Sequence, residues 1–245
     1  SYDVNNNWNL YANYAKGRRS PVVDASAAGT TITKAEIVDS YDLGVKYQSA
    51  NFIFSGAIFT YEYSDYQQSY TDQETMQSIT VTVGDSTMSG IEGMATYNYS
   101  DTLTFTASLG FLDAEFADNT SDGSPFQYGG NKFRLAPEVS GAININKVVH
   151  FDNWTMDVNW LTSFQSEVFF ESSNYPGMSQ DTYSLTDFSL KLNRESSEFA
   201  YEFYVNNLFD KEFLIDAGNT GGRIGIPTFV RGMPRIAGVR LYYAF

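Results

Sequence analysis

The fold is decided by the last eleven residues of the chain, Arg235-Ile-Ala-Gly-Val-Arg-Leu-Tyr-Tyr-Ala-Phe245. Read with a period of two, one side of this stretch is mixed and polar, and the other carries Ala237, Val239, Leu241, Tyr243 and Phe245. Because successive side chains of a β-strand point to opposite faces, the pattern predicts a strand with one apolar face. Chain termini in water are usually polar, whereas a transmembrane β-strand needs apolar residues at alternate positions and aromatic residues at the membrane surface. We therefore expect a lipid-facing strand, with Tyr243 and Phe245 at the membrane interface as part of an assembly signal.

The composition of the whole chain agrees with a membrane-embedded β-structure. Only 18% of the 245 residues are charged, and a low charged fraction favours a surface that is not entirely wetted. No run of about eighteen apolar residues is present to form a spanning helix, but barrel strands need an apolar residue only at every second position. The net charge of −14 argues against nucleic acid as a partner, since phosphate binding needs clustered Lys and Arg. Without cysteine, the chain has no disulfide and no thiolate metal site.

Alternating apolar and polar residues, separated by turn signals, predict ten strands. The clearest begins at Leu103 and ends at Phe111, about the length that a tilted strand needs to cross a bilayer. Asp113 and Glu115 continue its apolar side, so the strand is expected to project beyond the lipid. In the third strand, two apolar faces compete and the sequence does not decide between them. The strands are expected at 8–16, 38–49, 52–66, 89–99, 103–111, 138–146, 154–169, 199–206 and 235–245, with the eighth following the 171–181 connection and ending at 187–193.

Long and short connections alternate between these strands. Short turns fall at 50–51, at 100–102, around His150 and at 194–198. Long polar connections fall at 17–36, 67–87, 117–130, 171–181 and 208–234, and the second is expected to hold an extra hairpin around 79–83. A membrane barrel has short periplasmic turns and long extracellular loops, whereas a soluble sandwich has no reason for such alternation. The predicted fold is all-β, a transmembrane antiparallel β-barrel of about ten strands in the outer membrane of a Gram-negative bacterium.

One stretch also carries a family signature. Asn207-Leu-Phe-Asp-Lys-Glu-Phe213 resembles the Asn-Leu-Phe-Asp-Lys-x-aromatic motif near the end of TonB-dependent receptors, and residues 232–235, 238–241 and Phe245 resemble the closing strand of that family. Residues 10–17, 38–46 and 134–138 are similar to further segments of its barrel. The resemblance implies a 22-stranded barrel that is preceded by a globular plug and a short energy-coupling segment.

Neither a plug domain nor a coupling segment is recognisable in residues 1–245. The chain is therefore expected to be the C-terminal β-barrel portion of a TonB-dependent receptor. Unpaired edge strands are not viable in lipid. Either the chain belongs to a longer polypeptide, or another chain completes the wall; ten strands that close on themselves would contradict this interpretation.

No catalytic set, cofactor site or metal site is expected. His150 is the only histidine and falls at a periplasmic turn, where a solvated residue is expected rather than a catalytic one. Asp72 with Glu74, or Asp118 with Asp122, could offer oxygen ligands to calcium, but their spacing lacks a binding-loop pattern, so solvated loop acids are favoured.

Three charged residues are expected to meet on the non-lipid face. Lys191 and Glu202 lie at similar distances from the turn between their strands, and Arg240 lies about as far from the chain end. They are predicted to form a luminal charge cluster near the periplasmic end. Ion pairing within the wall is the favoured role, and contact with a plug is the alternative.

The long loops should carry the ligand-binding residues. Aromatic rings suit stacking on sugars, and Arg suits anionic iron chelates. For any single residue, packing between loops is the competing explanation. The candidates are Arg18, Arg19, Tyr66, Tyr70, Phe126, Tyr128, Phe170, Tyr175 and Arg223.

The resemblance implies uptake of a scarce ligand, an iron chelate or a glycan, driven by a TonB-type energy-coupling protein of the inner membrane. A passive porin-like channel and a self-contained ten-stranded barrel enzyme are the alternatives. A plug domain would separate the first from the passive channel, and a periplasmic His150 argues against the enzyme.

Overall fold

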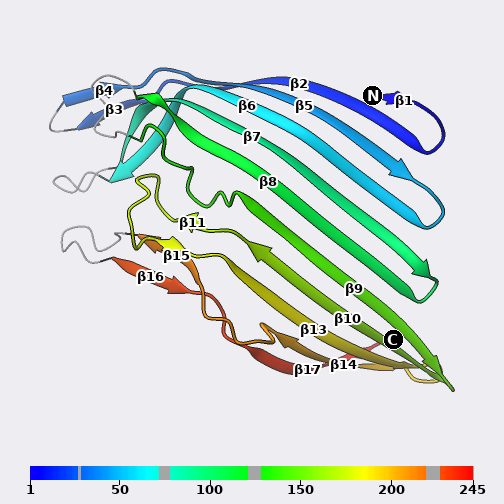
Figure 1. The fold of residues 1–245 in the computed structure, drawn as a ribbon. Helices are drawn as coiled ribbons and strands as arrows, with labels where there is room; N and C mark the ends of the chain where they lie inside the picture. Colours follow the sequence, from blue (N-terminus) through cyan, green and yellow to red (C-terminus); the bar gives the residue numbers. More distant parts are fainter. Residues whose placement is uncertain (27–28, 72–77, 121–127, 219–226, 245) are drawn as a thin grey trace.

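The computed structural model describes residues 1–26, 29–71, 78–120, 128–218 and 227–244, and it contains strands but no helix in these ranges. No helix among these residues is long and apolar enough to cross a membrane. One 11-stranded antiparallel sheet forms the body of the chain (Figure 1). In spatial order its strands are β1 (Tyr2–Asp3), β2 (Trp8–Arg19), β5 (Glu36–Gln48), β6 (Phe52–Thr71), β7 (Ser78–Ser100), β8 (Leu103–Thr120), β9 (Val139–Phe151), β10 (Trp154–Gln165), β13 (Tyr183–Arg194), β14 (Phe199–Asn206) and β17 (Ile236–Tyr243).

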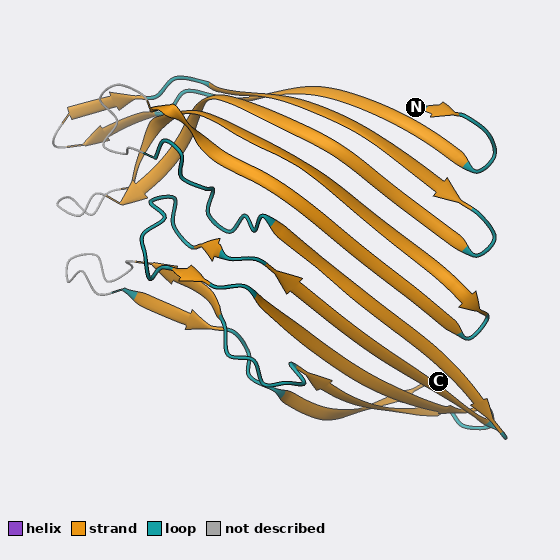
Figure 2. Cartoon of the chain, viewed as in Figure 1, coloured by secondary structure: helices purple, strands orange, loops and turns teal. Residues whose placement is uncertain are grey.

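The sheet is a curved wall with its tight turns at one end and its long loops at the other (Figure 2). The loop end carries three short hairpins, β3–β4 (Val23–Ser26 and Gly29–Ile32), β11–β12 (Val168–Phe169 and Ser179–Gln180) and β15–β16 (Leu214–Gly218 and Thr228–Arg231). Within the described residues the wall does not close on itself, because β17 pairs with β14 and β1 pairs with β2 at the two edges. The predicted ten strands are confirmed, and the two-residue β1 is added at one edge.

Cross-strand partners share a face, so the register assigns each residue to one of two surfaces. On the apolar face, Leu43, Ile58, Ile91 and Phe111 are direct neighbours across four strands. Each of these side chains is about half exposed, at 47% to 54%. Apolar patches of this extent are rare on soluble monomers and mark a surface that another medium or molecule covers.

The register also decides which of the two competing faces of the third predicted strand is apolar and which is polar. Phe52, Phe54 and Ile58 of β6 belong to the apolar face, and Phe59 and Tyr61 belong to the polar face. Phe59 fits there because its ring lies over a glycine of β7. A Cβ atom at Gly90 would come within 2.5 Å of Cζ of Phe59 and 2.6 Å of the backbone oxygen of Phe111.

Aromatic side chains mark the turn end of the apolar face. Trp8 packs against Tyr47 with a ring-centre distance of 4.6 Å, and Phe199 packs against Tyr243 at 5.0 Å. Such aromatic girdles flank the apolar band of membrane barrels.

Charged residues mark the other end of the apolar face. Lys16, Asp39 and Glu62 are neighbours across β2, β5 and β6, and the Nζ atom of Lys16 lies 3.0 Å from a carboxylate oxygen of Asp39. Glu115 occupies the same row on β8. The apolar face is therefore a band of limited height between an aromatic and a charged row.

The hairpin predicted around 79–83 is present, but it is not a separate element. Instead, β6 and β7 continue as one hairpin to Thr71 and from Ser78, with a bulge at which Asp65 has a φ of 54° and Gly84 a φ of 138°. The extension persists because Val81 and Val83 are buried against the neighbouring end of β8 and the following loop. The seventh predicted strand is also too long, since β10 ends at Gln165.

Candidate functional site on the polar face and in the long loops

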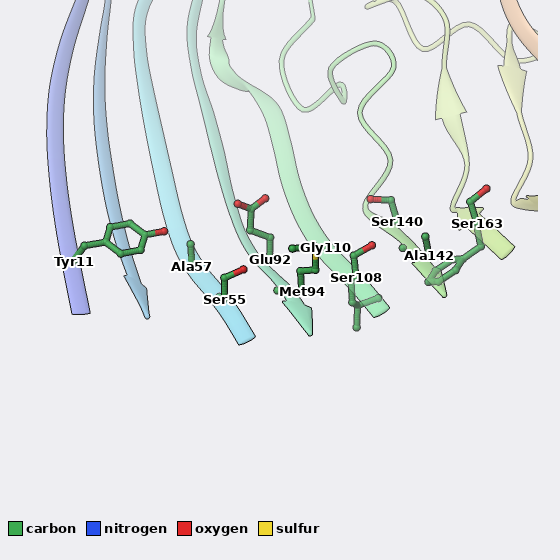
Figure 3. A pocket seen from close by; sticks show the side chains of 15 residues that line it. Tyr11, Ser55, Ala57, Glu92, Met94, Ser108, Gly110, Ser140, Ala142 and Ser163 are labelled. Carbon is green, nitrogen blue, oxygen red and sulfur yellow. The ribbon is translucent and has the colours of Figure 1, made fainter. Parts of the chain in front are cut away.

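The polar face holds a groove of about 570 Å³ in the middle of the wall (Figure 3). Its floor consists of small side chains because the register brings Gly44, Ala57, Gly110 and Ser140 into one row across β5, β6, β8 and β9. A second row beside it contributes more short side chains. The polar-face residues of the groove are Tyr11, Ser55, Ala57, Glu92, Met94, Ser108, Gly110, Ser140, Ala142 and Ser163.

Tyr11 and Glu92 stand on either side of Ala57 in this row. The Tyr11 ring lies flat over Gly44, where a Cβ atom would come within 2.1 Å of it, and Figure 3 shows the ring extending toward Ala57. Lys46 sits 5.5 Å from the centre of the Tyr11 ring. Glycine at position 44 therefore makes room for an aromatic ring that would otherwise project into the groove.

Glu92 differs from the other acidic residues of the polar face. Asp42 accepts hydrogen bonds from Tyr61 at 3.2 Å and from Asn13 at 3.3 Å, and Asp157 accepts one from Asn146 at 2.6 Å. The Glu92 carboxylate has no hydrogen-bond or ion-pair partner within the described ranges. The groove thus presents an uncompensated negative charge over a floor of small residues.

A second polar cluster lies near the turn end of the wall. Lys191, Glu202 and Arg240 are direct neighbours across β13, β14 and β17, on the same face as the groove. Arg240 Nη1 lies 3.1 Å from Glu202 Oε2, and the Tyr242 hydroxyl donates to the same oxygen at 2.5 Å. The Lys191 ammonium lies 4.5 Å from the centre of the Tyr242 ring. The structure therefore brings the three charged residues together and adds Tyr242, which the sequence pattern did not single out.

Two apolar clusters stabilise the long loops. In the first, Val81, Val83, Ala114, Phe116 and Phe133 are buried together, with Tyr66 and Tyr128 packed against them. The second contains Val168, Phe170 and Ala217.

Hydrogen bonds connect the loops between these clusters. Gln68 Nε2 donates to Ser172 Oγ at 3.2 Å, and Asn131 Nδ2 donates to the Ser172 carbonyl at 2.9 Å. Asn174 and Lys132 exchange two further bonds, of 2.7 and 2.9 Å. The loop end of the wall is therefore an ordered layer in the described ranges.

The ligand-binding candidates are dispersed over this layer. Arg19 lies on the polar face, 4.0 Å from Glu36, and donates to the Gln67 carbonyl at 3.3 Å. Arg18 lies on the opposite face of β2 and is exposed. Tyr175 is 61% exposed. Arg18, Arg19 and Tyr175 are thus the exposed members of the candidate set in the described ranges.

Burial removes other members from direct access. Phe170 is only 2% exposed at the centre of the second apolar cluster, so its expected contact with a ligand is replaced by loop packing. Tyr66 and Tyr128 pack against Phe116, and burial raises the pKa of both phenols. For Tyr70 only the backbone is placed, opposite Ile79 in the β6–β7 hairpin. Phe126, Arg223 and Phe245 lie outside the described residues.

The other residues considered for chemistry show no assembled site. His150 lies beside the β9–β10 turn, where Nδ1 is 3.2 Å from Thr155 Oγ1. In the described ranges, no group of His, Asp and Glu side chains is placed to hold a metal ion; Asp72, Glu74 and Asp122 lie outside them. The groove itself could not be predicted from the sequence because its rows appear only when the register of seven strands is known.

Comparison with known proteins adds relatives of the whole wall. The pesticin receptor of Yersinia pestis is 21% identical over 215 residues, which is 86% of this chain and 30% of that protein. The ferric yersiniabactin uptake receptor FyuA of Yersinia pestis superposes on 100% of this chain, with a TM-score of 0.83 and 19% identity. The ferric preacinetobactin receptor BauA of Acinetobacter baumannii superposes on 98% of it, with a TM-score of 0.73 and 16% identity.

The chain spans about a third of the length of these proteins, 36% of FyuA and 34% of BauA. The open sheet therefore has the fold of about a third of each of these structures. The sequence model of the protein family described as TonB dependent receptor-like, beta-barrel matches residues 1–208. The chain belongs to the family of TonB-dependent receptor β-barrels.

Proposed function

We propose that residues 1–245 form the C-terminal part of the barrel of an outer-membrane receptor that takes up a ferric chelate by TonB-coupled transport. The match of residues 1–208 to the receptor barrel family carries this proposal. The names of the relatives indicate the ligand class, since FyuA and BauA are receptors for ferric yersiniabactin and ferric preacinetobactin. A glycan is the second candidate ligand. In this assignment the chain transports and performs no covalent chemistry.

The two faces of the wall support placement in the outer membrane of a Gram-negative bacterium. The half-exposed apolar face suits contact with lipid hydrocarbon, and the aromatic and charged rows suit its two boundaries. Within the described residues, the outer edge of β17 and the part of β2 beyond its short pairing with β1 have no neighbouring strand. Such edges would be costly in lipid, so further strands, from the same or another chain, complete the barrel. A plug domain and a TonB-type energy-coupling protein are the other partners that the family implies.

The loop layer is the proposed site of ligand capture. Arg18 and Tyr175 offer an exposed cation and an exposed ring, suited to an anionic chelate and to a planar or sugar group respectively. Arg19, Tyr66 and Tyr128 are held by loop contacts and serve to shape this layer. Glu202 and Arg240 serve as an ion pair of the wall, with Lys191 beside them against the Tyr242 ring, because within the described residues the contacts of this cluster are made by the wall itself.

Uptake of iron by the host organism tests the proposal. The gene that encodes this chain is deleted, and uptake of radiolabelled iron is measured with a panel of ferric chelates, with and without dissipation of the proton-motive force. Energy-dependent uptake of at least one chelate should be lost on deletion and restored by the intact gene. Iron uptake that persists after the proton-motive force is dissipated would instead support a passive channel. If the deletion abolished the uptake of labelled glycans and left that of every ferric chelate unchanged, the ligand class would be glycans.

A further inference from the structure

Two cavities adjoin on the apolar face of the wall, where the apolar band meets the charged row. Their volumes are about 520 and about 250 Å³, and both are lined by Ser89 and Asp113. Because they share these two residues, the two cavities form one hollow, the boundary cavity.

The boundary cavity exists because β8 loses its neighbouring strand at this height. β9 begins at Val139, and the preceding residues 134–137 leave the sheet opposite Asp113 of β8. The backbone hydrogen bonds on either side of this bulge join Leu112 to Glu138 and Phe133 to Ala114. Cross-strand neighbours normally fill the space beside a side chain on a sheet face, and in the described ladder Asp113 has no such neighbour on the β9 side.

The two parts of the boundary cavity differ in polarity. The larger part reaches into the apolar band, where its lining includes Ile91, Phe111 and Val139. The smaller part lies toward the loops and is lined by hydroxyl and carboxylate side chains, those of Thr87, Ser89, Asp113, Glu115 and Asp118. An occupant of both parts must therefore be apolar at one end and polar at the other. A membrane lipid has this form, and lipid hydrocarbon adjoins the apolar band of a membrane barrel.

The polar part of the cavity is negatively charged. Asp113 and Glu115 are exposed, and neither carboxylate has a hydrogen-bond or ion-pair partner within the described ranges. Lys132 lies opposite Glu115, but its ammonium pairs with Glu138 at the edge of the larger part. A headgroup that covers unpaired carboxylates is costly unless it supplies the opposite charge. An ammonium group would supply that charge and would add charge-assisted hydrogen bonds.

We propose that the boundary cavity binds a phospholipid whose headgroup carries a primary ammonium group. Asp113 and Glu115 hold the ammonium. An acyl chain of the lipid lies against Phe111 and Val139. The inference goes beyond the proposed function and rests on one part of it, the placement of the wall in a membrane.

Native mass spectrometry of the intact receptor, released from detergent micelles, tests the headgroup contact. Phosphatidylethanolamine and phosphatidylglycerol with identical acyl chains are added in turn, without divalent cations. Phosphatidylethanolamine should bind about tenfold more tightly, as expected for a hydrogen bond to a charged group. Asp113→Asn combined with Glu115→Gln should abolish this preference. Glu92→Gln is the matched control, because it removes an unpaired carboxylate from the opposite face of the wall, and it should leave the preference unchanged.

The acyl-chain contact is tested separately. Phe111→Ala should weaken the binding of both lipids alike, because it removes part of the apolar lining. Phe105→Ala lies on the same face of β8 but outside the cavity, and it should change neither affinity. Folding of each variant is verified by the heat-dependent mobility of the barrel in gel electrophoresis.

The lipid site and the proposed function can fail separately. Equal affinity of the unaltered receptor for the two lipids, or a preference that survives the double substitution of Asp113 and Glu115, would overturn the lipid site even with normal iron uptake. A preference for phosphatidylglycerol once calcium is added would also overturn it, because the carboxylates would then hold a divalent cation. A carboxylate-dependent preference for phosphatidylethanolamine in a receptor that imports no ferric chelate would support the lipid site and contradict the proposed ligand.

Discussion

Glu202 and Arg240 oppose each other across β14 and β17, with 3.1 Å between the carboxylate and the guanidinium. The Arg240 guanidinium also lies 4.1 Å from the centre of the Tyr204 ring, so it is fixed by contacts to two residues of β14. β17 is an edge strand of the described sheet, and β14 is the one strand that pairs with it there. The contacts of Arg240 therefore help to keep β17 in register with β14.

Replacing Glu202 by Gln should lower the urea midpoint of unfolding of the intact receptor. The substitution keeps the size of the side chain but removes the charge that binds Arg240 and Tyr242. In a double-mutant cycle, Arg240→Gln should cost less in the Glu202→Gln background than in the wild-type receptor, because the ion pair is already broken and the contact with the Tyr204 ring remains to be lost. Additive effects of the two substitutions would contradict a direct interaction.

Alanine at Gly90 should destabilise the wall far more than alanine at Gly110. A Cβ atom at position 90 would meet the Phe59 ring at 2.5 Å and a backbone oxygen at 2.6 Å, whereas at position 110 the nearest atom, of Ser140, is 3.6 Å away. Overpacking of this kind costs about 1–3 kcal/mol. Thermal unfolding of the two variants in detergent measures the difference, and equal midpoints would argue against the ring-over-glycine contact.

Phe116→Ala should loosen the loop layer and leave the apolar band intact. The ring lies 4.5 Å from Phe133 and is 2% exposed, and truncation of a buried Phe costs about 3–5 kcal/mol. Protease cleavage within the β6–β7 extension should therefore increase, while the heat-dependent mobility of the barrel persists. Tyr175→Ala, at a 61% exposed position, is the control and should change neither.

Alkaline pH should open the same layer. Burial raises the pKa of the Tyr66 phenol. The pKa of Lys34 is also raised, because its ammonium donates a hydrogen bond to Asp65. A raised pKa in the folded state stabilises the fold below the ordinary pKa of the group, and this contribution is lost as pH rises through the raised value. Opening should thus begin above about pH 10, the ordinary range of both groups.

Hydrogen exchange of the loop layer, recorded against pH with exchange rates corrected for base catalysis, measures this opening. Tyr66→Phe removes the ionisable phenol and keeps the ring, so it should shift the opening to higher pH. An unchanged profile in this variant would assign the alkaline sensitivity to other groups.

Period-two alternation predicted the faces of most strands because it depends only on local sequence. The alternation between Leu103 and Phe111 is an example, and the structure places this apolar row next to Ile91 and Ile143. Alternation cannot assign the faces where both carry aromatic rings, as in β6, with Phe52 and Phe54 on one face and Phe59 and Tyr61 on the other. There the decision depends on Gly90, which lies about thirty residues away and makes room for the Phe59 ring.

The loop end was the least predictable part for a related physical reason. The sequence around Val81 and Val83 predicted a separate hairpin. Local sequence could not show the continuous extension, because these valines are buried by Phe116 and Phe133, which come from distant segments. The candidate ligand residues were chosen by type, and tertiary packing then buried Phe170 and exposed Tyr175. The Glu92 groove likewise requires the register of strands, which alternation within a single strand does not contain.

The apolar band between the Trp8–Tyr47 row and the Lys16–Asp39 row has a fixed height. Because no second protein layer covers the band in the described part of the chain, its surroundings contribute directly to the free energy of the folded state. Hydrophobic mismatch with a bilayer that is too thick or too thin then costs a fraction of a kcal/mol per Å. In the proposed outer-membrane placement, the receptor should be most stable in lipids whose acyl-chain length matches this band, and membrane thickness would then be a physical determinant of where it resides.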